Sequence, residues 1–127
     1  MTEKIEIKSI DAPDFSTSAG TKNTTEICPT KEQVINAIKT VEDPDIGIDI
    51  YNLGLIYNID ISKFGDVKID MSLTSPTCPY AEKLVHDTAH AIAELNEAGE
   101  VFVKLIWDPA WEISKLTDEA KYELDLL

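Results

Sequence analysis

Two stretches near the middle of the chain alternate apolar and polar side chains, and only residues 63–66 separate them. Alternation with a period of two is typical of a β-strand that buries one face. The short connection favours an antiparallel hairpin. The apolar positions are Leu55, Tyr57, Ile59, Ile61, Val67, Ile69, Met71 and Leu73. The chain is therefore expected to build a sheet with one apolar face that helices must cover.

Segments with helical periodicity flank this hairpin. In residues 31–42 the apolar side chains share one helical face, and Thr30 with Gln33 has the pattern of a capping box. Asp43 precedes Pro44 and so avoids the α conformation, which is expected to end the helix. The remaining predicted elements are a helix over 79–97, a strand over 101–107 and a short helix that begins at Thr117.

The order helix-strand-strand-helix-strand-helix predicts a two-layer α/β (α+β) sandwich, in which a small mixed sheet is covered by helices. If the second and third strands are parallel, the connection between them through residues 75–99 should be right-handed. We expect one such domain over residues 30–127 and a flexible, polar tail over residues 1–29. Ile5 and Ile7 alternate with charged residues, so this part of the tail also suits a short strand added to a partner.

Charge and composition exclude several classes of protein. With 24 acidic against 11 basic residues, the formal net charge is −13, which argues against binding nucleic-acid phosphates or anionic lipid. No apolar run approaches the ~20 residues of a membrane span, and the first residues lack a secretory signal pattern. Two cysteines are too few for a disulfide scaffold. We expect a cytoplasmic protein.

Cys78 stands where a predicted strand ends and a predicted helix begins. Pro79 suits the first helical position, which would make Cys78 the residue that caps the helix. A thiolate at a helix N-terminus is favoured by the unpaired N–H groups and the helix dipole, and it suits metal or sulfur chemistry. The alternative is a small buried side chain in the core, because free cysteine is often buried.

Other residues suggest chemistry more weakly. His86 and His90 are four residues apart on a helix and could share a metal, but they fall among acidic residues on the polar face. Asp43, Asp45 and Asp49 could hold a hard cation, although their spacing is not that of a calcium loop. Trp107 and Trp111 could stack on a ligand or seal the edge of the core. The distance of the histidines from Cys78 argues against a Cys–His hydrolase.

Three segments, in this order, resemble one family. They are Asp43-Pro-Asp45 with Asn52-Leu-Gly-Leu-Ile56, then Met71-Ser-Leu-Thr-Ser-Pro-Thr-Cys-Pro79, then Trp107-Asp-Pro-Ala-Trp111 followed by Thr117-Asp-Glu-Ala120. Together they are similar to the SufT/PaaD-like metal–sulfur cluster biosynthesis family of iron–sulfur assembly factors. The chain departs from the family pattern at Thr77, where glycine is common, and at Ala110, where proline is common.

The resemblance implies an accessory factor in iron–sulfur protein maturation rather than an enzyme. It implies Cys78 as the residue that contacts a transient iron–sulfur cluster or iron, with no tightly bound cofactor. Implied partners are scaffold or carrier proteins and apo clients, and a cluster shared across a homodimer is one arrangement. Motif residues with an implied docking role are Asp43, Pro44, Asp45, Thr74, Pro79, Trp107 and Trp111. The alternative is an interaction module of a multicomponent oxygenase pathway that binds no cluster.

Overall fold

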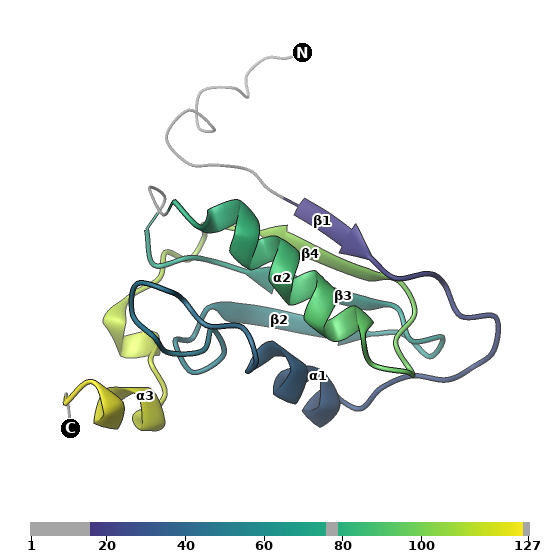
Figure 1. Cartoon of the computed structure of the whole chain (residues 1–127), viewed down its shortest axis with the longest axis horizontal. Coiled ribbons are helices and arrows are strands. Elements are labelled where there is room, and N and C mark those ends of the chain that lie inside the picture. Colours follow the sequence, from purple (N-terminus) through teal and green to yellow (C-terminus); the bar gives the residue numbers. More distant parts are fainter. Residues whose placement is uncertain (1–15, 76–78, 126–127) are drawn as a thin grey trace, which may run out of the picture.

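The computed structural model describes residues 16–75 and 79–125, and it contains four strands, three α-helices and one 3-10 helix in that part of the chain. In chain order these are β1 (Ser16–Ala19), α1 (Lys31–Ile38), β2 (Ile56–Ile61), β3 (Val67–Met71), α2 (Ala81–Ala93), β4 (Val101–Leu105), η2 (Ile113–Lys115) and α3 (Asp118–Glu123). Figure 1 shows their arrangement as helices laid against one sheet. The predicted α+β class is confirmed.

The sheet has the strand order β1-β4-β3-β2. β2 and β3 form the predicted antiparallel hairpin, with a register irregularity between Ile56 and Asn58. β3 and β4 are parallel, which is the arrangement that the sequence left as a condition, with Ile69 opposite Val103. The connection between these two strands runs through α2, so the carboxyl ends of β3 and β4 lie side by side at one end of the sheet.

β1 is the element that sequence reasoning did not predict. Residues Ser16–Ala19 pair antiparallel with β4 at one edge of the sheet, inside the segment expected to be a tail. The segment is poor in large apolar residues, but antiparallel pairing is made by backbone groups and needs few of them. Thr17 and Ala19 are half-buried, and Ala19 packs against the core. The division into a tail over 1–29 and a domain over 30–127 otherwise stays a prediction.

One face of the sheet carries the core, and the other is open. In β4, Val101, Val103 and Leu105 are buried, whereas Phe102 and Lys104 are exposed. α2 crosses the inward face in Figure 1, and α1 lies beside it on the same side. The amphipathic stripes of both helices meet the buried strand residues there, which is what the alternating pattern requires.

The helix boundaries differ in part from the predictions. The Thr30–Gln33 capping box is present, with the Gln33 amide donating to Thr30 Oγ1 at 3.1 Å and the Thr30 amide donating to Gln33 Oε1 at 2.8 Å. α1 nevertheless ends at Ile38, before Asp43, because the Thr40 hydroxyl bonds the Ala37 carbonyl and competes with further helical turns.

α2 is shorter than the predicted helix over 79–97. Tyr80 is its N-cap residue and Ala81 its first helical residue. Pro79 lies in the turn before the cap, so the prediction that Pro79 opens the helix and Cys78 caps it is wrong. Proline also suits turns, where its fixed φ is useful, and the sequence alone does not distinguish the two positions. The terminal helix begins where the sequence predicted, with Thr117 as its N-cap residue, since Thr117 Oγ1 accepts from the Ala120 amide.

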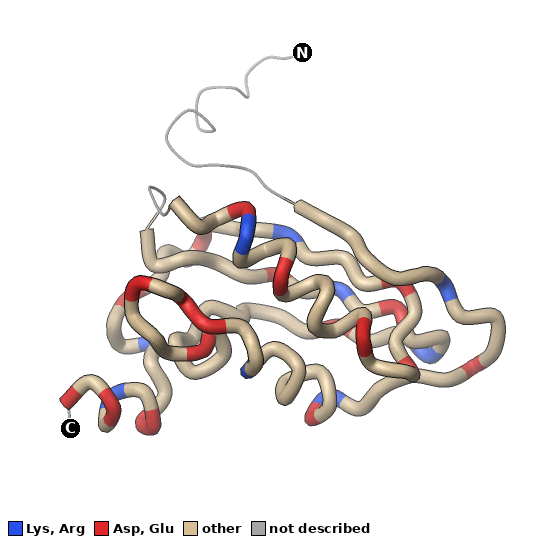
Figure 2. Tube along the Cα trace, in the orientation of Figure 1, with Lys and Arg blue, Asp and Glu red and all other residues tan. Residues whose placement is uncertain are grey.

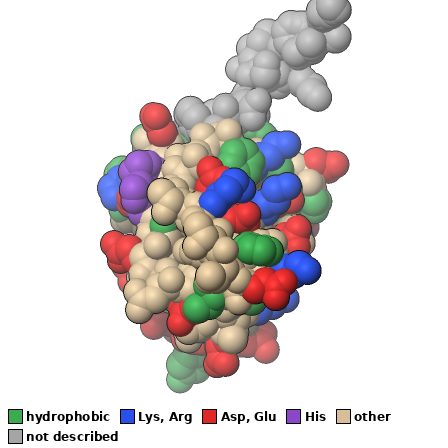
Figure 3. Space-filling model, turned by 90° about the vertical axis from the view of Figure 1, so that its right-hand side faces the viewer, with side chains coloured by type: hydrophobic (Ala, Val, Ile, Leu, Met, Phe, Trp, Pro, Cys, Tyr) green, Lys and Arg blue, Asp and Glu red, His purple; other side chains and the backbone are tan. Residues whose placement is uncertain are grey.

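Asp66 organises the end of the molecule that carries the β2–β3 turn. Its Oδ1 accepts the Glu100 amide at 3.0 Å and its Oδ2 accepts Lys22 Nζ at 3.3 Å. The hydrogen bond from Glu100, followed by the charge of Lys22, holds the pKa of Asp66 below its usual value. Figure 3 shows this end of the molecule, where acidic and basic side chains adjoin.

A lowered carboxyl pKa stabilises the folded state above the unfolded pKa, and the stabilisation is lost as pH falls through the folded pKa. We therefore expect Asp66→Asn to lower the free energy of unfolding at pH 7 and to lower it less at pH 3. Urea unfolding across this range measures the effect, with Glu94→Gln, an exposed acid at the end of α2, as control. An unchanged gap between wild type and variant at both pH values contradicts the assignment.

Candidate functional site

The three sequence motifs meet at the carboxyl edge, which we define as the ends of β3 and β4 with the segments 43–54, 72–75, 79–80 and 106–117. The Ser72 amide donates to the Leu55 carbonyl at 2.8 Å, and the Ile106 amide donates to the Met71 carbonyl at 2.7 Å. The first bond joins the second motif to the first, and the other joins the second motif to the residue that precedes the third. Ligands in open α/β sheets bind at this kind of edge.

The Asp43-Pro-Asp45 turn is held by the first aspartate and exposes the second. Asp43 is 2% exposed; its Oδ1 accepts the Asp45 amide at 2.9 Å, and its carbonyl accepts the Gly47 amide at 2.7 Å. Pro44 and Asp45 are exposed. Asp43 therefore shapes the turn, while Pro44 and Asp45 are open to a partner.

Asn52 links this loop to the third motif, a role that sequence reasoning missed. Its Nδ2 donates to Asp49 Oδ1 at 2.7 Å, and its Oδ1 accepts the Thr117 hydroxyl at 2.8 Å. The Asn52 carbonyl also accepts the Thr117 amide at 3.0 Å. The side chain is 8% exposed, and buried polar groups normally need such partners. The only signal in the sequence was the family motif that contains Asn52.

Trp111 and Gly54 also hold the segment that contains Asn52 against the segment 111–117. Trp111 Nε1 donates to the Leu53 carbonyl at 2.6 Å, and the indole packs against the core. Gly54 has φ of +77°, and a Cβ there would lie 2.1 Å from the Lys115 carbonyl oxygen. Trp107 follows β4 and is also partly buried against the core. Both tryptophans therefore seal the edge of the core, as one of the two sequence interpretations held.

Gly54 offers a test of how much this close approach matters. Gly54→Ala must both strain a positive φ and push the Lys115 carbonyl away, so we expect a loss of more than about 3 kcal/mol in the free energy of unfolding. Gly47→Ala is the matched control, since Gly47 has φ of +79° but open space around its Cβ position, and it should lose only about 1–2 kcal/mol. Equal losses in denaturant titrations would show that the contact is unimportant.

Cys78 lies outside the described residues, and its neighbours mark where its segment attaches. Thr74, partly buried, follows the end of β3, and Pro79, exposed, precedes the cap of α2. The segment that contains the cysteine thus leaves the sheet and rejoins the fold at the carboxyl edge. The role predicted for this residue stays a prediction.

Two hydroxyl groups are buried at the same edge. Ser72 is fully buried, and neither Ser72 Oγ nor the Tyr57 hydroxyl oxygen has a hydrogen-bond partner among the described residues. Burial raises the pKa of Tyr57, and Glu112 acts in the same direction; the nearby Ser72 hydroxyl opposes the shift without reaching hydrogen-bond geometry. Lys115 Nζ lies 5.1 Å from the Tyr57 ring centroid, over its face.

The structure places the other cysteine away from this edge. Cys28 is exposed, and the carbonyl of the adjacent Ile27 accepts from Asn23, which also bonds the Phe64 carbonyl at the opposite end of the sheet. His86 and His90 are exposed, with ring centroids 4.1 Å apart. Residues 16–75 and 79–125 contain no group of three His, Cys, Asp or Glu side chains placed to hold a metal ion.

The loop beside the carboxyl edge is strongly acidic. Figure 2 shows acidic residues clustered on this loop and on the terminal helix. A recess between them has a volume of about 110 Å³ and is lined by Glu42, Gly47, Ile48, Asp49, Asn52, Glu119, Ala120 and Glu123. Both carboxylate oxygens of Asp49 accept hydrogen bonds from Asn52, so this carboxylate stabilises the loop.

The site and fold have close counterparts among known proteins. The family described as "Iron-sulfur cluster assembly protein" matches residues 31–104. The Fe-S protein maturation auxiliary factor YitW of Bacillus subtilis is 38% identical over 76% of this chain and 94% of its own length. The Fe-S protein maturation auxiliary factor SufT of Staphylococcus aureus is 36% identical over 66% of this chain and 96% of its own.

A solved structure supports the same assignment. A domain of unknown function (DUF59) from Bacillus anthracis has a TM-score of 0.72 and 30% identity, over 76% of this chain and 92% of that one. This chain therefore belongs to the iron–sulfur cluster assembly protein family. The SufT-like resemblance read from the three motifs is confirmed. Within the described part of the chain, no helix is long and apolar enough to span a bilayer.

Proposed function

We propose that this protein is a cytoplasmic accessory factor for the maturation of iron–sulfur proteins and that it acts without enzymatic turnover. The observation that carries the proposal is the family match together with the meeting of all three motifs at one edge of the sheet. The relatives' names, which describe maturation auxiliary factors, point in the same direction. In this proposal the iron–sulfur cluster is cargo that the protein helps to deliver.

Cys78 is the residue that we assign to the cargo. A cluster is normally held by four thiolates or their substitutes, and this chain has two cysteines, of which Cys28 is tied to the far end of the sheet. A single chain therefore supplies one thiolate at the carboxyl edge, and the other ligands must come from a scaffold, a client or a second copy. One thiolate against four required ligands favours brief contact with a cluster or with iron over stable storage of a cluster by one chain.

The surroundings of the cysteine segment suit protein docking. Pro44, Asp45 and Pro79 are exposed, and Thr74 is partly exposed. The turn that carries Pro44 and Asp45 is fixed by hydrogen bonds to Asp43. Rigid display of exposed groups lowers the entropy lost on binding. We assign these residues to contacts with carrier and apo-client proteins. In this proposal Asp43, Trp107 and Trp111 stabilise the segments on which the contact residues lie.

The central test is replacement of the thiol. Because we assign the thiol to binding and not to packing, we expect Cys78→Ser to leave the free energy of unfolding within about 0.5 kcal/mol of wild type. Maturation of cluster-dependent enzymes should fall to the level of cells without the protein. The readout is the activity of those enzymes and their iron and sulfide content after anaerobic purification.

Cys28→Ser is the matched control, because it removes an exposed thiol at the opposite end of the fold. It should support maturation like wild type. Full maturation by Cys78→Ser would remove the thiol from the mechanism and leave a docking role alone.

Anaerobic reconstitution with iron and sulfide separates a carrier from an adaptor. For a carrier we expect visible cluster absorbance with wild-type protein and its loss with Cys78→Ser, because the remaining ligands cannot replace a thiolate. Absorbance that depends equally on Cys28, or that persists in Cys78→Ser, contradicts the assignment of the site.

A further inference from the structure

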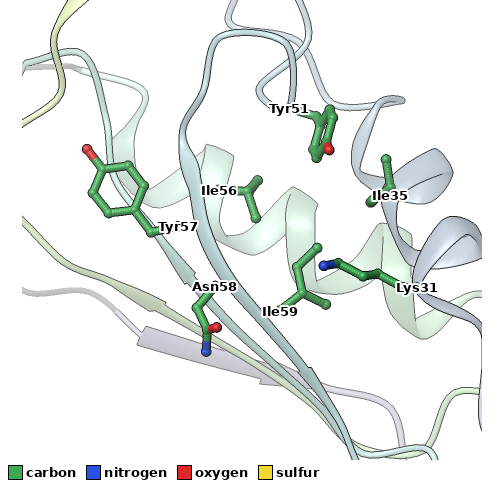
Figure 4. A pocket seen from close by; sticks show the side chains of 7 residues that line it. All are labelled: Lys31, Ile35, Tyr51, Ile56, Tyr57, Asn58 and Ile59. Carbon is green, nitrogen blue, oxygen red and sulfur yellow. The ribbon is translucent and has the colours of Figure 1, made fainter. Parts of the chain in front are cut away.

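A groove on the far side of the hairpin from β4 is not used by the proposed function. It runs between α1 and β2, has a volume of about 190 Å³, and is lined by Lys31, Ile35, Tyr51, Ile56, Tyr57, Asn58 and Ile59. Figure 4 shows Lys31 beside Ile59 and Tyr51 nearer to Ile56. The volume exceeds that of engineered apolar cavities that admit benzene, at ~150 Å³, so a branched aliphatic side chain can enter.

The strand beside this groove is an edge strand. Among the described residues β2 pairs on one side only, with β3. Edge strands present a row of unpaired N–H and C=O groups that can pair with another chain segment. Along the regular part of β2, Ile59 and Ile61 are half-buried towards the helices, whereas Asn58 and Asp60 are exposed on the open face. An added strand must therefore alternate apolar and polar side chains.

Residues 3–10 of this chain, Glu-Lys-Ile-Glu-Ile-Lys-Ser-Ile, lie outside the described residues, and the stretch from Lys4 to Lys8 within them has that alternation. If Ile5 and Ile7 face the groove, Glu3 falls on the same side and can meet Lys31. Lys4, Glu6 and Lys8 then face the open side, where Lys4 can meet Asp60. Opposite charges across neighbouring strands are favourable. Because Lys31 lies at the Ile59 end of the groove, the segment must run antiparallel to β2.

The reach of the chain favours a second copy as the source of the segment. β1 starts at Ser16, on the opposite edge of the sheet and at the end where β2 begins. A strand added to β2 lies four strand spacings from β1, or about 19 Å. Six fully extended steps from Ile10 to Ser16 reach only about 20 Å. Within one chain this link would run taut and straight across the carboxyl edge, whereas a second copy imposes no such path.

We propose that residues 3–10 of one copy add an antiparallel strand to β2 of a second copy, with Ile5 and Ile7 in the groove beside α1. The exchange is reciprocal, so it produces a twofold dimer. Each chain then completes the free edge of its partner's sheet. The inference stands apart from the proposed function, because neither the groove nor the segment includes Cys78.

Sedimentation velocity of the full chain over a range of concentrations tests the dimer. Ile5→Asp with Ile7→Asp should weaken dimerisation by at least about a hundredfold, because two buried aliphatic side chains are lost. Lys4→Ser with Glu6→Ser is the matched control on the other face of the same segment, and we expect a change within about fivefold. Dimerisation that survives the isoleucine changes overturns the proposal.

A charge exchange tests the register. Glu3→Lys and Lys31→Glu should each weaken the dimer by about two- to fivefold, as expected for an exposed pair, and the double variant should recover. Failure of the double variant to recover overturns the antiparallel placement. Lys31→Glu places an acid in the first turn of α1, where it is compatible with the helix dipole, so misfolding is not expected to confuse the result.

Isotope-filtered NMR on mixed labelled and unlabelled copies identifies the source of the segment. Contacts between the Ile5 and Ile7 methyl groups and Ile35 or Ile59 should cross between copies. Contacts within one copy, in a monomer, would show that the segment folds back on its own chain and would overturn the exchange between copies. The absence of contacts both within and between copies would overturn docking of the segment in the groove. Cys78→Ser should dimerise like wild type, so loss of maturation and loss of the dimer are separate outcomes.

Discussion

The parallel pairing of β3 with β4 is the constraint on which the rest of this structure depends. It requires a long connection, and α2 both provides this connection and covers the inward face of the sheet. It also brings the ends of two strands together, so the segments that follow them must share one edge. The segment from β3 to α2, which carries Cys78, and the segment after β4, which carries both tryptophans, are neighbours for this reason.

Periodicity predicted most of the layers because it reports burial directly. The alternation in β2, β3 and β4 and the capping box of α1 involve neighbours in sequence, and these features were correct. β1 was missed because its stability comes from β4 and α2, and nothing in Ser16–Ala19 itself signals a strand. The start of α2 was misplaced because proline fits both a first helical position and the turn before a cap.

The candidate site was less predictable than the fold. Asn52 and Thr117 are 65 residues apart in the chain and bond through side chain and backbone, which no local pattern reveals. Asp43, which the resemblance placed among the docking residues, is buried and shapes the turn, and its docking role stays a prediction. Only the family resemblance pointed to Asn52, and it does not distinguish residues that stabilise the edge from residues that are exposed on it.

The place of β1 has a consequence for how the chain reaches this fold. Ser18 pairs with Phe102, so the two partners are made about 80 residues apart during synthesis. The β2–β3 hairpin can close early, while the growing chain still lacks β4, and β1 has no neighbour until β4 has emerged. Contacts between such distant residues form slowly, since a large loop must close first. Among the strands that the structure describes, β1 is therefore expected to join the sheet last, although it is synthesised first.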